Sequence, residues 1–505
     1  MACLTAIRPA GAETAVDLTP RRPAGQVLQV TAAYQVAGTL SLPGPDQPTR
    51  VPLAVTATAT YDQRRLAVDS PRADGRDAAR HARWQSARYY RQQDAKLVIN
   101  GQEITPSLRE TRRLIGASYS QGRLTIFSPQ GPLTREELDL VEWPGDGLVA
   151  DALLPKDRVT VGDRWELDPA WLAALVNIDA VGDSDVSAEL TQLQRDYARI
   201  DAQGLIRGTV DGATTTIELK ARCDFDLQHH RLHSLQLVLH EKRSPGEVTP
   251  GIEAVAKVRV QFRPLSRSEH LTDMVVAAMP APPDSATLQL SFQPDHGEYR
   301  LQHDRGWHVT SDGRSTAILR RIEDGDLVGQ CNISTLPLIL KGKQITLESF
   351  RDDVRSTLGE HFGQFLQAGQ YVDPQGHLVY HVAAVGQVTE VPVQWRYYLL
   401  GDTDGRRAAV IFTLDDSAAA RFGQADRQML AGFDFLTDPT GDSGQPAAAS
   451  RPGGPAPPAG NAATQPPQPK TTAPAPASAA RLGKDPSSAP VPGVTRRDQP
   501  PRSSR

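Results

Sequence analysis

Alternation of apolar and polar residues dominates the first half of the chain and is clearest from Thr216 to Leu227. One parity of this stretch is apolar and the other is charged: Ile217, Leu219, Ala221, Cys223, Phe225 and Leu227 against Glu218, Lys220, Arg222, Asp224 and Asp226. A period of two indicates a β-strand with one buried face and one solvated face.

Residues on both sides extend this strand into an antiparallel meander. The polar residues 228–231 predict a turn, after which leucines alternate again over 235–239. Val255–Val260 begins a further strand, and Gly204–Val210 precedes the first one. Consecutive strands joined by short polar turns favour antiparallel pairing.

The earlier part of the chain predicts the same class of structure less regularly. Strands are expected at Val51–Tyr61, Lys96–Ile99 and Arg123–Phe127, with Asn100-Gly101 as a two-residue hairpin turn. Two short helices are expected between strands. Thr134 and Glu137 form a capping box before one, and Asp168 caps the other at Pro169–Val176.

The second half mixes strands with two amphipathic helices. Thr346 caps the first helix, whose apolar stripe repeats every four residues at Phe350, Val354, Leu358 and Phe362. The second helix starts near Asp416 and turns Phe422, Ala425 and Met429 inward. Strands are expected at Ala286–Phe292, Tyr299–Asp304, Ala317–Arg321, Leu327–Ile333, 377–388, 391–400 and 406–414.

Two stretches resemble known families. Leu153-Leu154-Pro155-Lys156 with Val161-Gly162-Asp163-Arg164-Trp165 resembles uncharacterised secreted bacterial proteins with lipoprotein-carrier-like antiparallel sheets, over about residues 150–260. That resemblance implies a curved sheet wrapped around a helix or an apolar ligand.

The order of elements after residue 285 resembles the fold shared by the extrinsic P subunit of photosystem II and the Ran-binding Mog-type proteins. Gly306-Trp307, the helix at 346–362, and Ala408–Phe412 before the Phe422 helix carry the likeness. It implies an antiparallel sheet with helices on its faces and a binding or assembly role. No functional residue carries over, because no family motif is matched and a fold alone does not give function.

The predicted fold class is therefore α+β and β-dominated: an antiparallel sheet domain, then a Mog/PsbP-like α-β-α domain, then a disordered tail. The expected divisions are a leader or truncated signal remnant at 1–25, a β-rich domain at 26–270, a linker at 271–285, the second domain at 286–438 and the tail at 439–505. The tail holds 16 of the 40 prolines and no aromatic residue, so it cannot offset the entropy of an ordered backbone.

Composition excludes several classes of protein. A net charge of −4 excludes a polyanion binder that works through bulk charge, so no nucleic-acid partner is expected. Three cysteines exclude a disulfide-stapled scaffold and a four-cysteine zinc site. No stretch approaches the roughly 18 apolar residues of a transmembrane helix, so none is expected.

The N-terminal residues leave the location open. Met1–Ile7 is mostly apolar and is followed by Arg8, Pro9 and small residues, as at the end of a secretory signal whose start lies upstream. The alternatives are a disordered cytoplasmic leader and, more weakly, a lipoprotein cysteine at Cys3. We expect a cell-envelope (periplasmic) or secreted protein, with the cytoplasm as the alternative.

Histidines are the strongest candidates for chemistry. A zinc site or a base could be built from His229, His230 and His233, or from His303 and His308 with Asp304. Zinc needs three or four converging ligands, whereas neighbouring residues in a turn diverge. Surface turn histidines are therefore the favoured interpretation, and we predict no catalytic, cofactor-binding or metal residue.

Other patterns have structural explanations. Arginines from Arg64 to Arg91, interleaved with Trp84, Tyr89 and Tyr90, suit single-stranded nucleic acid, but interspersed aspartates favour a solvated loop. Asp352-Asp353 and Asp415-Asp416 suit helix starts. Gly441-Asp442-Ser443-Gly444 matches a serine-protease string but lies in the Pro/Ala-rich tail, without a base or an oxyanion hole. Cys223 lies on the buried parity of its strand, and its pairing with Cys331 stays open.

Three functions remain. The first is a non-catalytic exported bacterial protein that binds or scaffolds at the cell envelope, with an unknown protein partner. The second is a carrier of a lipid or other apolar small molecule in the first domain. The third is an unrecognised hydrolase or metal enzyme with His303 or His229 in its site. The chain is interpreted as leaning away from an enzyme.

Overall fold

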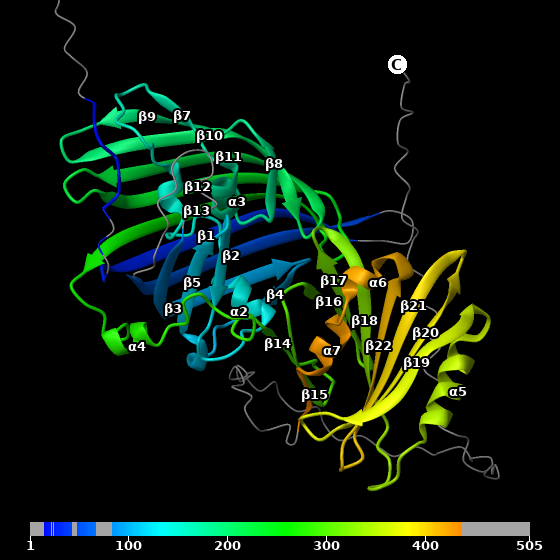
Figure 1. Cartoon of the computed structure of the whole chain (residues 1–505). Coiled ribbons are helices and arrows are strands. Elements are labelled where there is room, and N and C mark those ends of the chain that lie inside the picture. The colour runs from blue at the N-terminus through cyan, green and yellow to red at the C-terminus, as the bar shows by residue number, and fades with distance from the viewer. Residues whose placement is uncertain (1–14, 22, 24, 43–47, 67–82, 437–505) are drawn as a thin grey trace, which may run out of the picture. The chain divides into compact units, whose positions relative to one another are not determined.

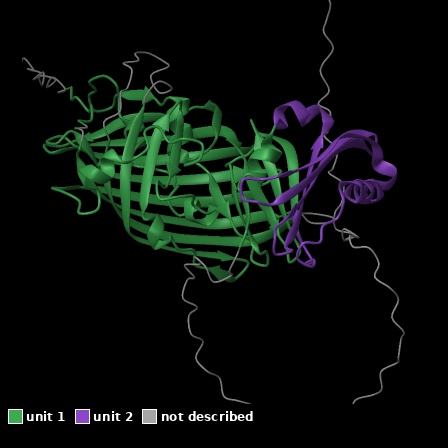
Figure 2. Cartoon of the chain, turned by 60° about the horizontal axis from the view of Figure 1, so that its bottom comes forward, with its two compact units in different colours: residues 1–332, 424–444 green, residues 333–423, 445–505 purple. Residues whose placement is uncertain are grey.

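The computed structural model describes residues 15–21, 23, 25–42, 48–66 and 83–436. Their packing divides the chain into two compact units, Met1–Asn332 with Gln424–Gly444 and Ile333–Gly423 with Gln445–Arg505 (Figure 2). Antiparallel sheets dominate both, which confirms the predicted β-rich α+β class. The predicted linker at 271–285, which would separate two independently folding domains, stays a prediction.

A thirteen-stranded antiparallel sheet forms most of the first unit (Figure 1). Eleven strands follow one another in the order β6 (Arg123–Phe127), β5 (Leu114–Ser120), β3 (Trp84–Ile99), β2 (Thr49–Arg65), β1 (Val27–Leu42), β13 (Gly251–Leu265), β12 (Arg231–Arg243), β11 (Ala213–Asp226), β10 (Tyr197–Val210), β9 (Ser187–Leu193) and β7 (Arg164–Glu166). β4 (Gln102–Ile104) pairs with β3, and β8 (Ala180–Ser184) pairs with β10.

The predicted meander is confirmed in β10–β13. Buried and exposed residues alternate along β11 in the parity read from the sequence, with Cys223 and Phe225 buried and Lys220 and Arg222 exposed. The sheet extends beyond the predicted meander. β13 pairs with β1 along its full length, from Val27 opposite Leu265 to Ser41 opposite Gly251. This non-local pairing joins the two halves of the sheet.

The inner face of the sheet is covered by the segment 133–176. It contains α2 (Arg135–Asp139), η2 (Ala150–Leu153) and α3 (Pro169–Val176), and its apolar residues share one core cluster with the sheet. Both predicted caps are present: Thr134 and Glu137 form the capping box of α2, and Asp168 accepts a bond from the Ala170 N–H in α3. Trp171 of α3 stacks on Trp84 and Tyr119 of the sheet, with ring centroids 4.5 and 4.3 Å apart.

Two segments expected to lie outside the folded domains pack against this unit. Val16 exchanges backbone bonds with Val159 and Leu18 is fully buried, so residues 15–21 of the expected leader are ordered. In the expected linker, Leu271 and Met279 on either side of α4 (Asp273–Ala277) are buried against Ala87 and Phe127. Neither segment shows the alternation that marks the sheet.

The rest of the first unit consists of shorter elements. β14 (Leu290–Phe292), β15 (Tyr299–His303) and β23 (Phe433–Phe435) form a three-stranded sheet, and β16 (Trp307–Asp312) pairs with β17 (Thr316–Glu323). β18 (Asp326–Leu336) runs into the second unit, whereas η1 (Glu110–Arg112) and α7 (Ala425–Leu430) belong to the first. The strand expected at Ala286–Phe292 is shorter because residues 286–289 form a turn.

The second unit is a meander covered by one helix. Its strands follow in the order β22 (Arg407–Asp415), β21 (Val391–Gly401), β20 (Leu378–Val388) and β19 (Phe362–Val372). α5 (Leu347–Leu358) is capped by Thr346 and buries Phe350, Val354 and Leu358 against these strands. The short helices η3 (Gly359–His361), η4 (Asp416–Ala418) and α6 (Ala419–Phe422) complete the unit.

Two predictions about local structure were wrong, one in each unit. The helix was expected to include Phe362, but Gly359 ends it at a positive φ of 54° and Phe362 begins the unpredicted strand β19. The residues from Trp84 to Arg91 were expected in a solvated loop, but they form the first half of β3. Tyr90 and the Arg88 side chain are buried in the sheet, and Trp84 and Tyr89 are half-buried.

The close contact of β5 with β6 gives a first testable expectation. A Cβ atom added to Gly116 would lie 2.2 Å from Cζ of the buried Phe127, so Gly116→Ala should lower the free energy of unfolding by about 1–3 kcal/mol. Gly182→Ala is the matched control, because its nearest contact would be 3.7 Å, and should change stability by less than about 0.5 kcal/mol. Urea denaturation followed by circular dichroism measures both, and equal effects would contradict the packing described.

Candidate functional site

The segment that covers the inner face is fixed to the sheet by a buried ion pair. Arg88 of β3 donates from both terminal nitrogens to the two carboxylate oxygens of Asp146, each at 2.6 Å. The two side chains are 1% and 5% exposed. Asp146 also accepts a bond from the Leu148 N–H at 2.8 Å, so the carboxylate both pairs with the sheet and shapes its own loop.

Two tyrosines complete the surroundings of this pair. Tyr61 and Tyr90 stack with centroids 4.8 Å apart, and Cζ of Arg88 lies 5.5 Å from the Tyr61 ring centroid. Burial alone would lower the pKa of Arg88, but attraction to Asp146 outweighs it and the pKa is raised. Burial raises the pKa of Tyr90 to about 12. Arg88 therefore stays charged and both phenols stay neutral at physiological pH.

A small cavity adjoins the pair. It has a volume of about 20 Å³ and is lined by the side chains of the pair, both tyrosines and apolar neighbours such as Val141 and Trp143. This volume holds about one water molecule. The inner face at this place is thus filled by the chain itself.

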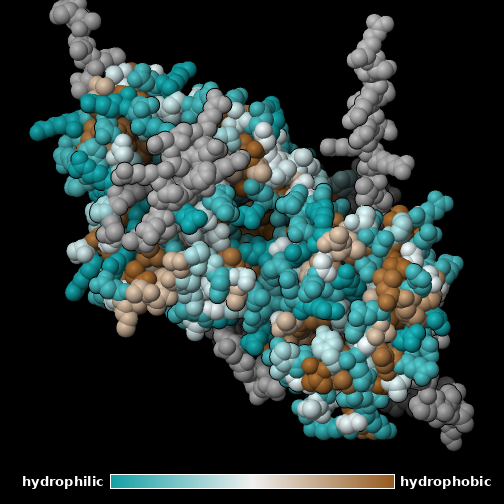
Figure 3. All heavy atoms as spheres, viewed as in Figure 1, coloured by the Kyte–Doolittle hydropathy of each residue, from teal (hydrophilic) through white to brown (hydrophobic). Residues whose placement is uncertain are grey.

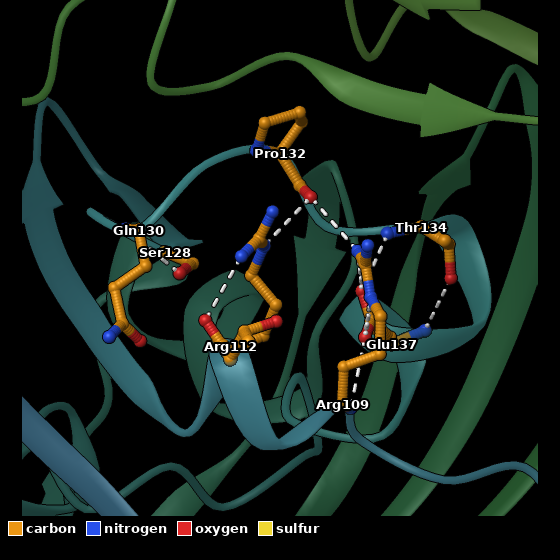
Figure 4. Close-up of polar contacts among 8 residues, drawn as sticks. Arg109, Arg112, Ser128, Gln130, Pro132, Thr134 and Glu137 are labelled. Atoms are coloured by element: carbon orange, nitrogen blue, oxygen red, sulfur yellow. Dashed lines mark hydrogen bonds and ion pairs between the residues drawn. The ribbon is translucent and has the colours of Figure 1, made fainter. Parts of the chain in front are cut away.

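A second anchor holds the start of the segment (Figure 4). Arg109 binds both carboxylate oxygens of Glu137 at 2.6 Å, and its Nη2 also donates to the Pro132 carbonyl at 3.1 Å. Glu137 accepts from the Thr134 N–H at 3.0 Å as well. Burial would raise the pKa of Glu137, but the bonds from Arg109 and from backbone N–H groups lower it. Both anchors fix the path of α2 and the loop after it.

Between the anchors lies a group of titratable residues that we call the acid–base cluster: Arg135, Asp139, Glu142, Asp211, Arg305 and His308. α2 and its following loop supply the first three, the β10–β11 turn supplies Asp211, the connection from β15 to β16 supplies Arg305, and β16 supplies His308. Nε2 of His308 lies 3.6 Å from Oδ1 of Asp211. Three segments distant in sequence thus bring both signs of charge together.

The pKa shifts in this cluster favour the neutral form of its side chains. Asp139 lies at the surface, yet enough protein surrounds it that lost hydration raises its pKa to about 6, helped by Glu136 and Asp211 and opposed by Arg135. Burial also raises the pKa of Glu142 and lowers that of His308. A carboxyl group that titrates near pH 6 can exchange protons with a bound molecule.

The sequence candidates among the histidines occupy separate places. His229 bonds through Nδ1 to Asp226 at 2.8 Å in an exposed turn, His230 packs its ring edge-on against Phe225, and His233 is exposed. His303 is buried, with Nδ1 2.8 Å from the Asp304 carbonyl, and it interacts electrostatically with Arg135 and His308 of the acid–base cluster. No group of three or more His, Cys, Asp or Glu residues suited to a metal occurs among the described residues.

The other candidates lie elsewhere. Cys223 and Cys331 are unpaired and buried, and burial raises the pKa of both thiols, so neither is a reactive thiolate. Asp352 and Asp353 lie within α5, and Asp415 caps η4. Residues 441–444 and the arginines at 72, 76 and 80 lie outside the described residues.

Sequence reasoning missed the two anchors and the acid–base cluster. Their partners are 58 and 28 residues apart for Arg88–Asp146 and Arg109–Glu137, and neither spacing matches a motif. One local signal was available: Asp146 lies between two glycines in Pro144-Gly145-Asp146-Gly147, where a tight loop exposes backbone N–H groups to its carboxylate.

Comparison with known proteins adds little. No family model matches the chain, and no curated protein matches it. PsbP from Synechocystis is 12% identical over 31% of this chain and 97% of its own (TM-score 0.24), and a variant of Mog1 is 10% identical over 29% and 96% (TM-score 0.24). Lipovitellin, solved for its lipid–protein interactions, is 11% identical over 67% of this chain (TM-score 0.28), which spans 31% of the lipovitellin chain. Similarities this low carry no functional argument.

The buried pair predicts a strong and specific stability effect. Arg88→Met leaves the Asp146 charge buried without its partner and should lower the free energy of unfolding by about 3–5 kcal/mol. Arg88→Met/Asp146→Leu should recover most of that loss because no charge is left stranded. The matched control Arg164→Met removes the solvent-exposed pair with Glu189 and should cost less than about 1 kcal/mol. Urea denaturation followed by tryptophan fluorescence measures all three, and a double variant as unstable as the single one would contradict this account.

The raised pKa of Asp139 predicts that replacing this residue stabilises the protein at high pH. The folded state holds this proton more tightly than the unfolded chain, so the contribution of Asp139 to stability is lost as pH rises from about 4 to about 6. Asp139→Asn should therefore be more stable than the wild type at pH 8, by less than about 1 kcal/mol because the side chain reaches solvent, and equal at pH 4. Thermal unfolding at both pH values tests this, and a variant less stable at pH 8 would refute it.

Proposed function

We propose that this chain is a non-catalytic bacterial protein that binds or scaffolds other molecules at the cell envelope. The observation that carries the proposal is the occupation of the inner sheet face by the chain's own segment 133–176, fixed by Arg88–Asp146 and Arg109–Glu137. A sheet filled in this way is a rigid body whose outer face and edges are available to partners.

The outer face suits such a role because it is polar and its charges are paired across strands. Arg199 bonds to Asp224 and Arg222 bonds to Asp201, both with a shortest distance of 2.7–2.8 Å between β10 and β11. Such cross-strand pairs stabilise the sheet and keep its surface hydrated. The surface is thus compatible with a long-lived scaffold.

The envelope location is compatible with the state of the cysteines. Buried thiols with raised pKa values react slowly with oxidants, so Cys223 and Cys331 tolerate an oxidising compartment. No helix of the described residues has the length and apolar character needed to cross a membrane. Fractionation of cells that express the native gene is expected to recover the protein from the envelope or the medium, and recovery from the cytoplasm would refute this part.

A second function, an unrecognised enzyme, is favoured by the acid–base cluster. Asp139, with a pKa of about 6, and His308, which lies 3.6 Å from Asp211, are titratable groups of the kind that acid–base catalysis uses. The carrier alternative has no comparable support, because the cavity on the inner face holds about one water molecule.

A substrate panel separates these functions. The purified full chain is assayed with ester, phosphate-ester, peptide and glycoside substrates beside Asp139→Asn and His308→Gln. The proposal predicts equal background rates for all three proteins. Turnover by the wild type that falls at least about tenfold in both variants, with folding intact by circular dichroism, would overturn the non-catalytic proposal and establish the cluster as an active site.

A further inference from the structure

Exposed apolar side chains gather at one end of the second unit. The four most exposed large apolar side chains of the described residues are Met274, Leu338, Leu340 and Val372, at 80%, 69%, 69% and 66%. Only Met274 belongs to the first unit. Figure 3 shows hydrophobic residues at the surface of the second unit among hydrophilic ones. Isolated exposed apolar side chains are common, but a group of them at one place marks a contact surface.

The strand register defines this end of the sheet. Val372, the last residue of β19, lies opposite Leu378 at the start of β20, which in turn lies opposite Gly401 at the end of β21. Leu338 and Leu340 belong to the loop between β18 and α5, which runs beside the β21–β22 turn (Figure 1). All three apolar side chains therefore lie at the end of the sheet where β19 and β21 finish.

The loop that carries the two leucines, residues 337–345, is bound to the sheet at two points. The Ile339 N–H donates to the Gly405 carbonyl of the β21–β22 turn at 3.1 Å. The Tyr380 hydroxyl of β20 donates to the Ile345 carbonyl at 2.7 Å, and the Ile345 side chain packs against the core of the unit. The bound backbone thus holds both leucines at the surface.

Positively charged side chains lie next to the leucines. The only charged residues of the loop are Lys341 and Lys343, and both are exposed. Lys341 binds Asp404 at 2.7 Å yet stays 76% exposed, and Lys343 forms no ion pair with any described residue. In the adjoining turn Asp402 binds Arg406 at 2.6 Å, so both carboxylates of the turn are already paired. An excess of positive charge therefore remains beside the exposed leucines.

We propose that this end of the second unit docks on the surface of an anionic lipid bilayer. Leu338, Leu340 and Val372 lie at the boundary between headgroups and acyl chains. Lys341 and Lys343 lie at the level of the lipid phosphates. The inference goes beyond the proposed function and does not depend on it, because a protein can scaffold without touching lipid and can touch lipid without scaffolding.

The exposure and charge of this end favour a bilayer over a protein. Each leucine is 69% exposed on a loop, so a protein partner would need a preformed hollow for each of them. Acyl chains rearrange around an apolar side chain that enters them, and lipid phosphates complement the lysines. A second copy docked through the same end would instead bring Lys341 and Lys343 of both loops together, which is repulsive.

Co-sedimentation of the full chain with vesicles tests the proposal. The wild type is expected to pellet with vesicles of phosphatidylcholine and phosphatidylglycerol in equal parts and to bind phosphatidylcholine alone more weakly. Leu338→Ser/Leu340→Ser removes both inserted side chains and should weaken binding to the mixed vesicles at least about tenfold. Lys343→Gln removes one unpaired cation and should weaken it about fivefold.

Matched variants separate the lipid contact from general effects of substitution. Leu338→Trp/Leu340→Trp keeps two apolar side chains suited to the membrane interface and should bind as tightly as the wild type. Met274→Ser removes the most exposed apolar side chain outside this end and should leave binding unchanged. Circular dichroism confirms that each variant is folded.

The outcomes that contradict the proposal are distinct. A wild type that stays in the supernatant, a Leu338→Ser/Leu340→Ser variant that pellets as well as the wild type, or equal binding to both kinds of vesicle would each overturn it. An equally large loss of binding in Met274→Ser would also overturn it. If vesicles are not bound, sedimentation velocity identifies the other occupants: a dimer that Leu338→Ser/Leu340→Ser dissociates indicates a second copy, and a monomer indicates a partner protein. Cell fractionation and the substrate panel are read independently of these results.

Discussion

The buried pair between Arg88 and Asp146 is the contact on which the architecture of the first unit depends. A curved sheet of thirteen strands has a wide apolar inner face, and in this chain a largely irregular segment must cover it. The backbone N–H and C=O groups of such a segment do not form ladder hydrogen bonds with the strands, so side chains must fix its position. One bidentate ion pair at 2.6 Å fixes the position of the loop, and apolar contacts such as Trp171 on Trp84 complete the core.

Ionic pairs at this depth usually gain little net stability, because desolvation offsets much of the attraction. In this protein the ion pair serves to fix the position of the loop. An apolar contact would hold the loop almost equally well in several registers, whereas a guanidinium and a carboxylate fit in one arrangement. Arg109–Glu137 has the same role at the other end of α2 and combines it with the helix cap. Between them, Asp139 and Glu142 lie where lost hydration raises the pKa of each, and the charge of Asp139 adds to the shift of Glu142.

The sequence predicted the parts of the fold whose causes are local. The alternation from Thr216 to Leu227, the caps at Thr134 and Asp168 and the stripe of α5 each depend on neighbouring residues, and each is present. It failed where distant partners decide the outcome. In a run of arginines, Arg88 is uninformative until Asp146 is placed opposite it, and the first half of β3 was therefore taken for a loop. β19 was missed because two bulges interrupt its alternation. The acid–base cluster was invisible because three separate segments supply it.

The pairing of β1 with β13 has a consequence for biosynthesis. One edge of β1 pairs with the nearby β2, but at the other edge Val27 lies opposite Leu265. In a growing chain that second edge therefore stays unpaired until more than half of the protein has left the ribosome. During that interval the nascent strands offer surfaces to chaperones and to one another. The order of synthesis, and not only the finished contacts, thus determines how often this chain reaches its native topology.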